Sequence, residues 1–420
     1  MNISPTLARP TITTASATRA PGALTRLAWS TLAAQSAEQV ALAAAPIVAV
    51  LALGADAAAT GWLQAAQTLP FLLLAIPAGV LVDRASRRGL MASAEALRAL
   101  SLAAVLALAS AGWLSVLVLG LLGFVAAWGT VAYSVAAPAL VPALVAPGTL
   151  VTANARLELA RTTAFVLGPA LAGVLAGWAD AAPAFAVSVA LSACAAAMLA
   201  RLPEPPRPLR ARRRVVHELR EGAAFVLGHP LLRPVLVTKT LFGAAFFVLQ
   251  AVFVHHAVHA LGLTARGVGA TLALYGAGMV AAALVAPALV RALPFGVVIA
   301  AGPVAGLIAG ISMAATIWVP SALLAAAAYV LVGAGPVVWI VSTNTLRQTV
   351  TPAHLLGRVA ALDIAAQGAR PIGAAAGAAV ASLHGTEACL LLSAVGFLVQ
   401  AAVIVASPAA RLRRQPEPPG

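Results

Sequence analysis

The segment GVLVDRASRR, residues 79–88, joins two long apolar runs at residues 59–82 and 89–109. Each run is long enough to cross a membrane, because about 20 mostly apolar residues span the hydrocarbon core of a bilayer as a helix. Lipid offers no hydrogen-bond partners for backbone amides. Each apolar run is therefore predicted to cross as a helix, which satisfies its own backbone groups. The charged segment is therefore predicted to be a short loop at one membrane surface.

The composition extends this interpretation to all 420 residues. Hydrophobic residues make up 62% of the chain and charged residues only 9%, whereas a soluble domain carries roughly 25% charged residues. About twelve apolar spans can be counted, and the halves on either side of a basic, proline-rich connector are similar in length. The spans run approximately over residues 27–53, 59–82, 89–109, 113–137, 150–178, 182–202, 232–260, 268–293, 296–317, 321–341, 359–383 and 388–406.

These spans predict an all-α membrane protein with five parts. The parts are a disordered cytoplasmic tail (1–23), an N-terminal six-helix bundle (24–202), a basic cytoplasmic connector (203–230), a C-terminal six-helix bundle (231–408) and a cytoplasmic tail (409–420). Sliding one half over the other by about 205 residues aligns Glu158 with Asp363 and Gly168 with Gly373. The halves are therefore predicted to be parallel repeats, an arrangement that many transporters use to place a substrate site between them.

The formal net charge of +14 would favour nucleic acid as a partner if the protein were soluble. Its bases instead gather in short loops after the second span, in the connector and at the chain end, whereas Arg266 is the only base in the opposite loops. Because cytoplasmic loops retain basic residues, both termini and the connector are predicted to be cytoplasmic. We expect a multi-pass protein of the bacterial inner membrane that contacts lipid and no nucleic acid.

Several function classes find no support in the sequence. It contains no glycine-rich phosphate loop of the ATP-driven kind, and no nucleophile, base and orienting acid stand at a spacing typical of an enzyme. Cys194 and Cys389 both lie inside apolar runs, which gives no basis for a disulfide framework or a metal site. His255, His256 and His259 are predicted to form a polar cap at the membrane surface. We therefore expect neither an enzyme nor a cofactor.

The loop at residues 79–88 resembles the signature loop of the major facilitator superfamily, with a glycine, an aspartate four residues later and a basic run. The resemblance implies the major facilitator fold, with about twelve transmembrane helices in two pseudosymmetric six-helix bundles. It also implies a conformational latch formed by Gly79, Asp83, Arg84, Arg87 and Arg88. The alternative for this loop is a charged cytoplasmic turn that only sets the topology.

The stretch PGTLVTANARLELARTTAFVLGPALAGVLAG, residues 147–177, resembles the fifth helix of the enterobactin-exporter-like branch of that superfamily. Gly168, Pro169 and Gly173 match a Gly-Pro signature associated with antiporters, which implies a gating helix. The segments that begin at Glu221 and Leu346 resemble the same branch. This resemblance implies a monomer that exports siderophores, drugs or other amphipathic metabolites.

Ionisable side chains inside the spans are candidates for function, because a charge at the bilayer centre costs from about 2.5 to more than 10 kcal/mol. Glu38 lies about 18 Å beyond Arg26 along its helix, near mid-depth. It is predicted to carry the coupled proton, and the alternative is a carboxyl group that holds helices together. Glu158, which shares a helix face with Arg161, and its repeat partner Asp363 are further candidates for proton coupling. Glu95 and Arg98 share a face near the cytoplasmic end and are predicted to be structural.

Arg370 lies about 20 Å along the eleventh span, where an arginine facing lipid would be too costly. It is predicted either to pair with an acid such as Glu38 or Asp363, or to attract an anionic group of a substrate. Lys239 is predicted to extend to the cytoplasmic headgroups. The candidates for substrate contact or charge balance in a central cavity are Arg370, Arg161, Gln35, Gln250, Gln367, Asn344, Trp128 and Tyr133, although such side chains also mediate helix contacts.

Together these features predict a secondary transporter that exports a small organic molecule by proton antiport, as its two halves alternate access to a central cavity. Two alternatives stay open at this point. One is a facilitator or importer on the same fold, for which uptake would not need a proton gradient. The other is a membrane sensor that moves no substrate.

Overall fold

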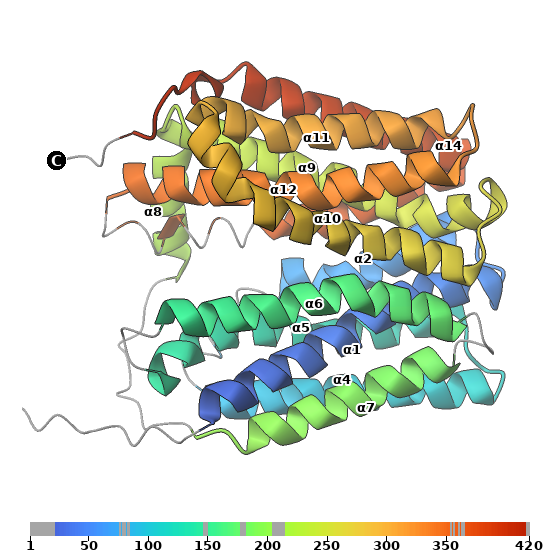
Figure 1. Cartoon of the computed structure of the whole chain (residues 1–420). Helices are drawn as coiled ribbons and strands as arrows, with labels where there is room; N and C mark the ends of the chain where they lie inside the picture. The colour runs from blue at the N-terminus through green and yellow to red at the C-terminus, as the bar shows by residue number, and fades with distance from the viewer. Residues whose placement is uncertain are drawn as a thin grey trace, which may run out of the picture.

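The computed structural model describes residues 22–74, 77, 81, 85–145, 150–176, 182–203, 215–352, 355, 358–359, 362 and 366–416. Within these ranges every regular element is a helix (Figure 1). The helices are α1 (Ala23–Leu51), α2 (Ala57–Leu73), α4 (Arg87–Ser110), α5 (Val116–Leu144), α6 (Leu150–Ala176), α7 (Ala182–Ala200), α8 (Val215–Gly228), α9 (Leu232–His259), α10 (Ala265–Ala292), α11 (Phe295–Ala315), α12 (Ala322–Val350) and α14 (Ala369–Val405), with two short 3-10 turns at Ala366–Gly368 and Pro408–Arg411.

Ten stretches in the described part of the chain are long and apolar enough to cross a membrane. Helix α2 has only 17 residues, and α14 has 37 residues and contains Gly385 with a φ of 81°. Glycine adopts this left-handed backbone without steric cost, so α14 can turn there and supply the last two predicted spans. The all-helical membrane fold with about twelve crossings is confirmed.

Side chains in the loops mark where several helices begin. Asp56 accepts a hydrogen bond from the Ala59 amide at 2.7 Å, and Ser86 accepts one from the Gly89 amide at 2.9 Å. Such caps satisfy backbone amides that the first helical turn leaves without partners. The loops around Asp56 and Ser86 therefore end one crossing and begin the next.

The helices form two bundles, with α1, α2 and α4–α7 in one and α9–α12 and α14 in the other (Figure 1). Helices α6 and α10 pack together across the division, as do α2 and α14. We call the end where α1 begins and α12 ends the terminal end, and the opposite end the far end. Helix α8 belongs to the predicted connector, where Glu221 pairs with Arg358.

The two bundles approach most closely through small residues. A Cβ atom added to Gly173 of α6 would lie 2.7 Å from the Gly269 Cα of α10, and one added to Gly61 of α2 would lie 2.7 Å from the Ala378 Cα of α14. Gly173 lies near the end of α6 and Gly61 near the start of α2, so both contacts belong to the far end. The bundles are therefore closed against each other there.

Candidate functional site

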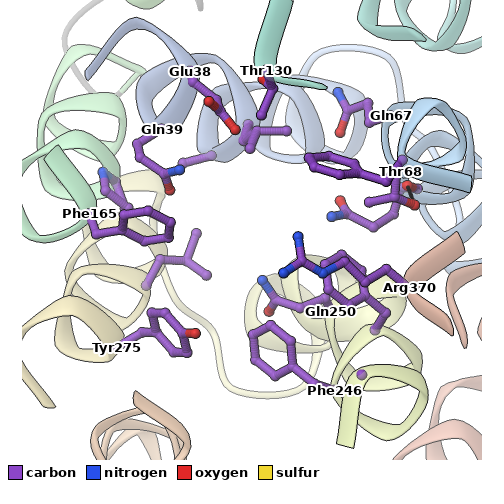
Figure 2. Close-up of a pocket in the computed structure, with 18 of the residues that line it drawn as sticks. Glu38, Gln39, Gln67, Thr68, Thr130, Phe165, Phe246, Gln250, Tyr275 and Arg370 are labelled. Carbon is purple, nitrogen blue, oxygen red and sulfur yellow. Dashed lines mark hydrogen bonds between the residues drawn. The ribbon is translucent and has the colours of Figure 1, made fainter. Parts of the chain in front are cut away.

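A cavity of about 400 Å³ lies between the bundles, lined by helices of both halves (Figure 2). Glu38 of α1 and Arg370 of α14 lie on opposite sides of this cavity. Gln67 and Thr68 of α2 and Gln250 of α9 add polar groups to the wall near Arg370 (Figure 2). The cavity volume falls within the range of about 300–1,000 Å³ that is typical of small-molecule sites.

The cavity continues toward the terminal end. A second hollow, of about 360 Å³, shares Lys239, Trp339 and Ile340 with the cavity and follows α12 to Asn344 and Arg347. Residue 347 lies in the last turn of α12. Since the far end is closed by the contacts between α6 and α10 and between α2 and α14, the structure has its cavity directed toward the terminal end.

A buried ion pair lies beside the cavity. The Arg98 guanidinium is 2.7 Å from Glu95, and their side chains are 2% and 0% exposed. Arg98 also donates to the Thr130 hydroxyl at 2.6 Å, and Glu95 accepts from the Ser192 hydroxyl at 3.0 Å. The pair was predicted near the cytoplasmic end of its span, but Arg98 lies eleven residues, or about 16 Å, from the start of α4, close to the middle of this helix of 24 residues.

Glu38 is the second carboxyl group next to Arg98. Its Oε2 lies 3.8 Å from Arg98 Nη2 and accepts a hydrogen bond from Gln35 at 3.2 Å, and its side chain is 12% exposed. One guanidinium thus faces two carboxyl groups, and Glu95 holds the shorter contact. Glu38 can therefore take up a proton without leaving the Arg98 charge unpaired, because Glu95 still balances it.

Arg98→Met is expected to destabilise the fold by about 3–5 kcal/mol, because it leaves buried carboxyl groups without their cation. Arg161→Met is the matched control, since Arg161 pairs with Glu158 at 2.5 Å but the two side chains are 43% and 58% exposed. Exposed pairs contribute only about 0–1 kcal/mol. Unfolding of the purified protein by SDS in mixed micelles measures both variants. Equal losses would show that the buried pair contributes no more than the exposed one.

Arg370 is held by aromatic rings. Its guanidinium carbon lies 5.3 Å from the ring centre of Phe71 and 5.7 Å from that of Phe247, both in the range of cation–π contacts. Among the residues that the structure describes, no carboxylate lies within 4 Å of Arg370. The predicted ion pair with Glu38 is therefore not formed, since the cavity separates the two side chains.

An aromatic wall lies across the cavity from the polar groups of α2. Phe246 of α9 stacks on Tyr275 of α10 with ring centres 5.5 Å apart, and Phe165 of α6 lies 6.4 Å from Tyr275. Arg161 lies over Phe165 at 5.5 Å and lines the cavity, with Glu158 as its ion-pair partner in α6. Helices from both bundles thus contribute to this wall.

The remaining predicted residues have different positions. Gln250 and Gln367 line the main cavity, Asn344 lines the second hollow, and Gln35 contacts Glu38. Trp128 and Tyr133 lie outside the cavity lining and pack in a cluster around Leu27 and Leu140 within the N-terminal bundle. The Tyr133 hydroxyl is 2.6 Å from that of Thr31 in α1, so Tyr133 links two helices instead of contacting the cavity.

The predicted gating helix is α6. Gly168 of this helix approaches Gln39 of α1, whereas Gly173 approaches α10 of the other bundle. Pro169 lines the cavity between them. The three residues therefore lie where α6 contacts both bundles.

Part of the predicted latch and one acid cannot be placed. Gly79, Asp83, Arg84 and Asp363 lie outside the described residues. Arg87 and Arg88 begin α4, and Arg88 donates to the Leu202 carbonyl at 3.0 Å.

Lys239 lines both hollows, a position in the cavity wall that the prediction of an extension to the headgroups did not include. Sequence reasoning missed the cavity positions of Arg98, Gln67, Phe165 and Tyr275. Of these residues only Arg98 had a signal in the sequence, which is its three-residue spacing from Glu95. The aromatic residues had none, because they do not stand out in an apolar span.

Comparison with known proteins places these features in a family context. Residues 27–370 match the family model described as Major Facilitator Superfamily. The "Uncharacterized MFS-type transporter y4rN" of Sinorhizobium fredii is 31% identical over 204 residues, which cover 46% of this chain and 47% of the relative. The chain thus matches about half the length of this curated relative.

Solved structures share the fold. The nucleoside transporter NupG has a TM-score of 0.72 at 14% identity, covering 91% of this chain and 98% of its own. A D-xylose–proton symporter has a TM-score of 0.70 at 14% identity, covering 92% and 98%. A bacterial homologue of the iron transporter ferroportin in an inward-facing state has a TM-score of 0.66 at 18% identity, covering 90% and 98%.

Proposed function

The chain belongs to the Major Facilitator Superfamily, and we propose that it is a secondary transporter that exports a small organic molecule by proton antiport. A siderophore, a drug or another amphipathic metabolite would be the cargo, and an inward proton gradient across the bacterial inner membrane would supply the energy. The protein would act as a monomer with its terminal end in the cytoplasm.

The observation that carries this proposal is the shared guanidinium of Arg98. Glu95 pairs with Arg98 at 2.7 Å inside the bundle, whereas Glu38 reaches the same cation from the cavity wall at 3.8 Å. A neutral, protonated Glu38 leaves the buried pair intact, and an ionised Glu38 adds a second attraction to Arg98. The side chain can thus switch between two charge states at the surface of the substrate cavity.

A transport cycle follows from this switch. In the conformation of the structure the cavity would accept cargo from the cytoplasm, and Glu38 would release its proton there. The contacts between α6 and α10 and between α2 and α14 would then separate, with the gating helix α6 moving relative to α10. Cargo would leave on the far side, and Glu38 would take up a proton before the return step. Glu158 and Asp363 are the other proposed proton-coupling residues, and the loop at residues 79–88 would latch one conformation.

Proton flux in vesicles tests this proposal. A comparison of metabolites secreted by deletion and overexpression strains would first identify a solute. Vesicles that contain the purified protein and a pH-sensitive dye should then acidify internally when that solute is given an outward gradient, because each exported molecule would be exchanged for protons. Protein-free vesicles are the control.

Other outcomes would favour the alternatives. Solute uptake that persists without any proton gradient would overturn antiport in favour of a facilitator or importer. Complete absence of flux for every secreted solute would favour a sensor.

A further inference from the structure

We infer that the cavity binds an organic anion with an aromatic ring, with the anionic group at Arg370 and the ring on the wall formed by Phe165, Phe246 and Tyr275. This inference rests on the proposed function, because it names the class of the cargo. It would exclude cationic drugs as the preferred substrates.

The arrangement of Arg370 supports an anionic group. Phe71 and Phe247 contact the guanidinium through ring faces at 5.3 and 5.7 Å. Stacking of this kind leaves the N–H groups at the edge of the guanidinium plane available as hydrogen-bond donors. A carboxylate can accept two of these bonds in parallel, which makes it a specific partner for arginine. The rings thus hold a cation in place without using its donors.

The described acids around the cavity have other arginines as their ion-pair partners. Arg98 is balanced by Glu95 with Glu38 as a second acid, and Arg161 is balanced by Glu158. Lys239 adds a further positive charge to the lining. Among the described residues no carboxylate is therefore paired with Arg370, and a bound anion would supply such a partner.

The opposite wall supports an aromatic ring. The rings of Phe246 and Tyr275 are 5.5 Å apart and inclined by 24°, and Phe165 continues the same surface. Aromatic side chains stack favourably with other rings at such separations. A ligand ring placed there would pack against the aromatic wall and lose its contact with water. The carboxylate of the same ligand would point across the cavity to Arg370.

Four buried polar atoms in the same lining have no hydrogen-bond partner within the described structure: Gln67 Oε1, Thr238 Oγ1, Trp339 Nε1 and Gln400 Oε1. Two of them, Gln67 Oε1 and Trp339 Nε1, belong to residues that are 5% and 7% exposed. Buried polar groups are normally paired, so unpaired ones in a cavity wall are available to a ligand. A hydroxyl or amide group on the aromatic anion could pair with either atom.

Calorimetry on the purified full-length protein in lipid nanodiscs tests the inference with three probes of one shape. These are 2-naphthoate, neutral 2-naphthamide and cationic (2-naphthyl)methylammonium. We expect 2-naphthoate to bind at least about tenfold more tightly than the other two, because a charge-assisted bidentate contact forms only with the anion. Arg370→Gln should abolish this preference and leave the affinity for 2-naphthamide within about twofold.

Two further variants separate charge from packing. Arg291→Gln, an exposed arginine at the end of α10, should leave all three affinities unchanged. Phe246→Leu should weaken all three probes while keeping the preference for the anion. Equal binding of 2-naphthoate and 2-naphthamide to the unmodified protein, an equal loss of all three probes in Arg370→Gln, or no binding of any probe would overturn the inference.

The binding experiment does not depend on transport, so the two proposals can fail separately. Tight, Arg370-dependent binding of 2-naphthoate without any proton movement in vesicles would overturn the proposed antiport alone. Proton-coupled export of a neutral or cationic solute by a protein that does not bind 2-naphthoate would overturn the anion inference alone.

Discussion

Gly276→Ala is expected to shift the protein from the conformation of the structure toward one that is open at the far end. A Cβ atom at this position of α10 would lie 2.7 Å from the Val166 Cα and the Phe165 carbonyl of α6. Both contacts are backbone, so α6 and α10 must separate. Overpacking costs about 1–3 kcal/mol, which changes a ratio of two populations by roughly 5- to 150-fold.

Spin-label distances measure this shift in a background that lacks Cys194 and Cys389. One pair, at Val174 and Arg266, reports on the far end, and a second pair, at Arg156 and Arg291, reports on the terminal end. The first distance should lengthen and the second should shorten.

The matched control is Gly243→Ala in α9. Its Cβ would lie 3.6 Å from the Ala369 Cβ inside one bundle, an ordinary contact, so both label distances should stay unchanged. If Gly276→Ala also left them unchanged, the contact between α6 and α10 would not be what closes the far end.

Glu38→Gln is expected to reduce proton movement coupled to solute export to the level of protein-free vesicles. The amide has nearly the volume of the protonated acid but cannot ionise, and it leaves the pair of Arg98 and Glu95 in place. Exchange of labelled for unlabelled solute at equal concentrations should therefore continue. The pH inside vesicles and the exchange rate are measured on the same preparation.

Two other carboxyl variants show whether the effect belongs to Glu38. Glu387→Gln, in an exposed position at the far end, should move protons normally. Glu158→Gln tests the other described acid proposed for coupling, whose side chain is 58% exposed and lies outside the cavity lining. Normal coupling in Glu38→Gln together with loss in Glu158→Gln would reassign the proton site.

The membrane crossings could be predicted from the sequence because the length and apolarity of a span are local properties. The candidacy of Glu38 and Arg370 was also accessible, since an ionisable residue inside a long apolar span stands out in the sequence. The predicted break between the eleventh and twelfth spans coincides with Gly385, where the chain turns within α14.

Helix rotation could not be predicted, and most errors at the site follow from it. Lipid and the protein interior are both apolar, so a membrane helix shows no clear hydrophobic face along its sequence. Trp128 and Tyr133 were placed in the cavity by type, but they face a cluster within their own bundle. Phe165, Phe246 and Tyr275 could not be distinguished from lipid-facing aromatic residues until their helices were oriented.

The position of Arg98 shows a second limit. Its spacing from Glu95 predicted a self-neutralising pair, which the structure confirms at 2.7 Å. The approach of Glu38 from another helix is a tertiary contact between residues far apart in the chain, and the sequence pattern contains no signal for it.

Infrared spectroscopy of the purified protein in nanodiscs during a pH titration tests most directly whether Glu38 carries a proton. We expect a C=O stretching band of a protonated carboxylic acid that disappears as the pH rises in the unmodified protein and in Glu387→Gln, and that is absent from Glu38→Gln at every pH. Identical titrations of the unmodified protein and Glu38→Gln would contradict the account.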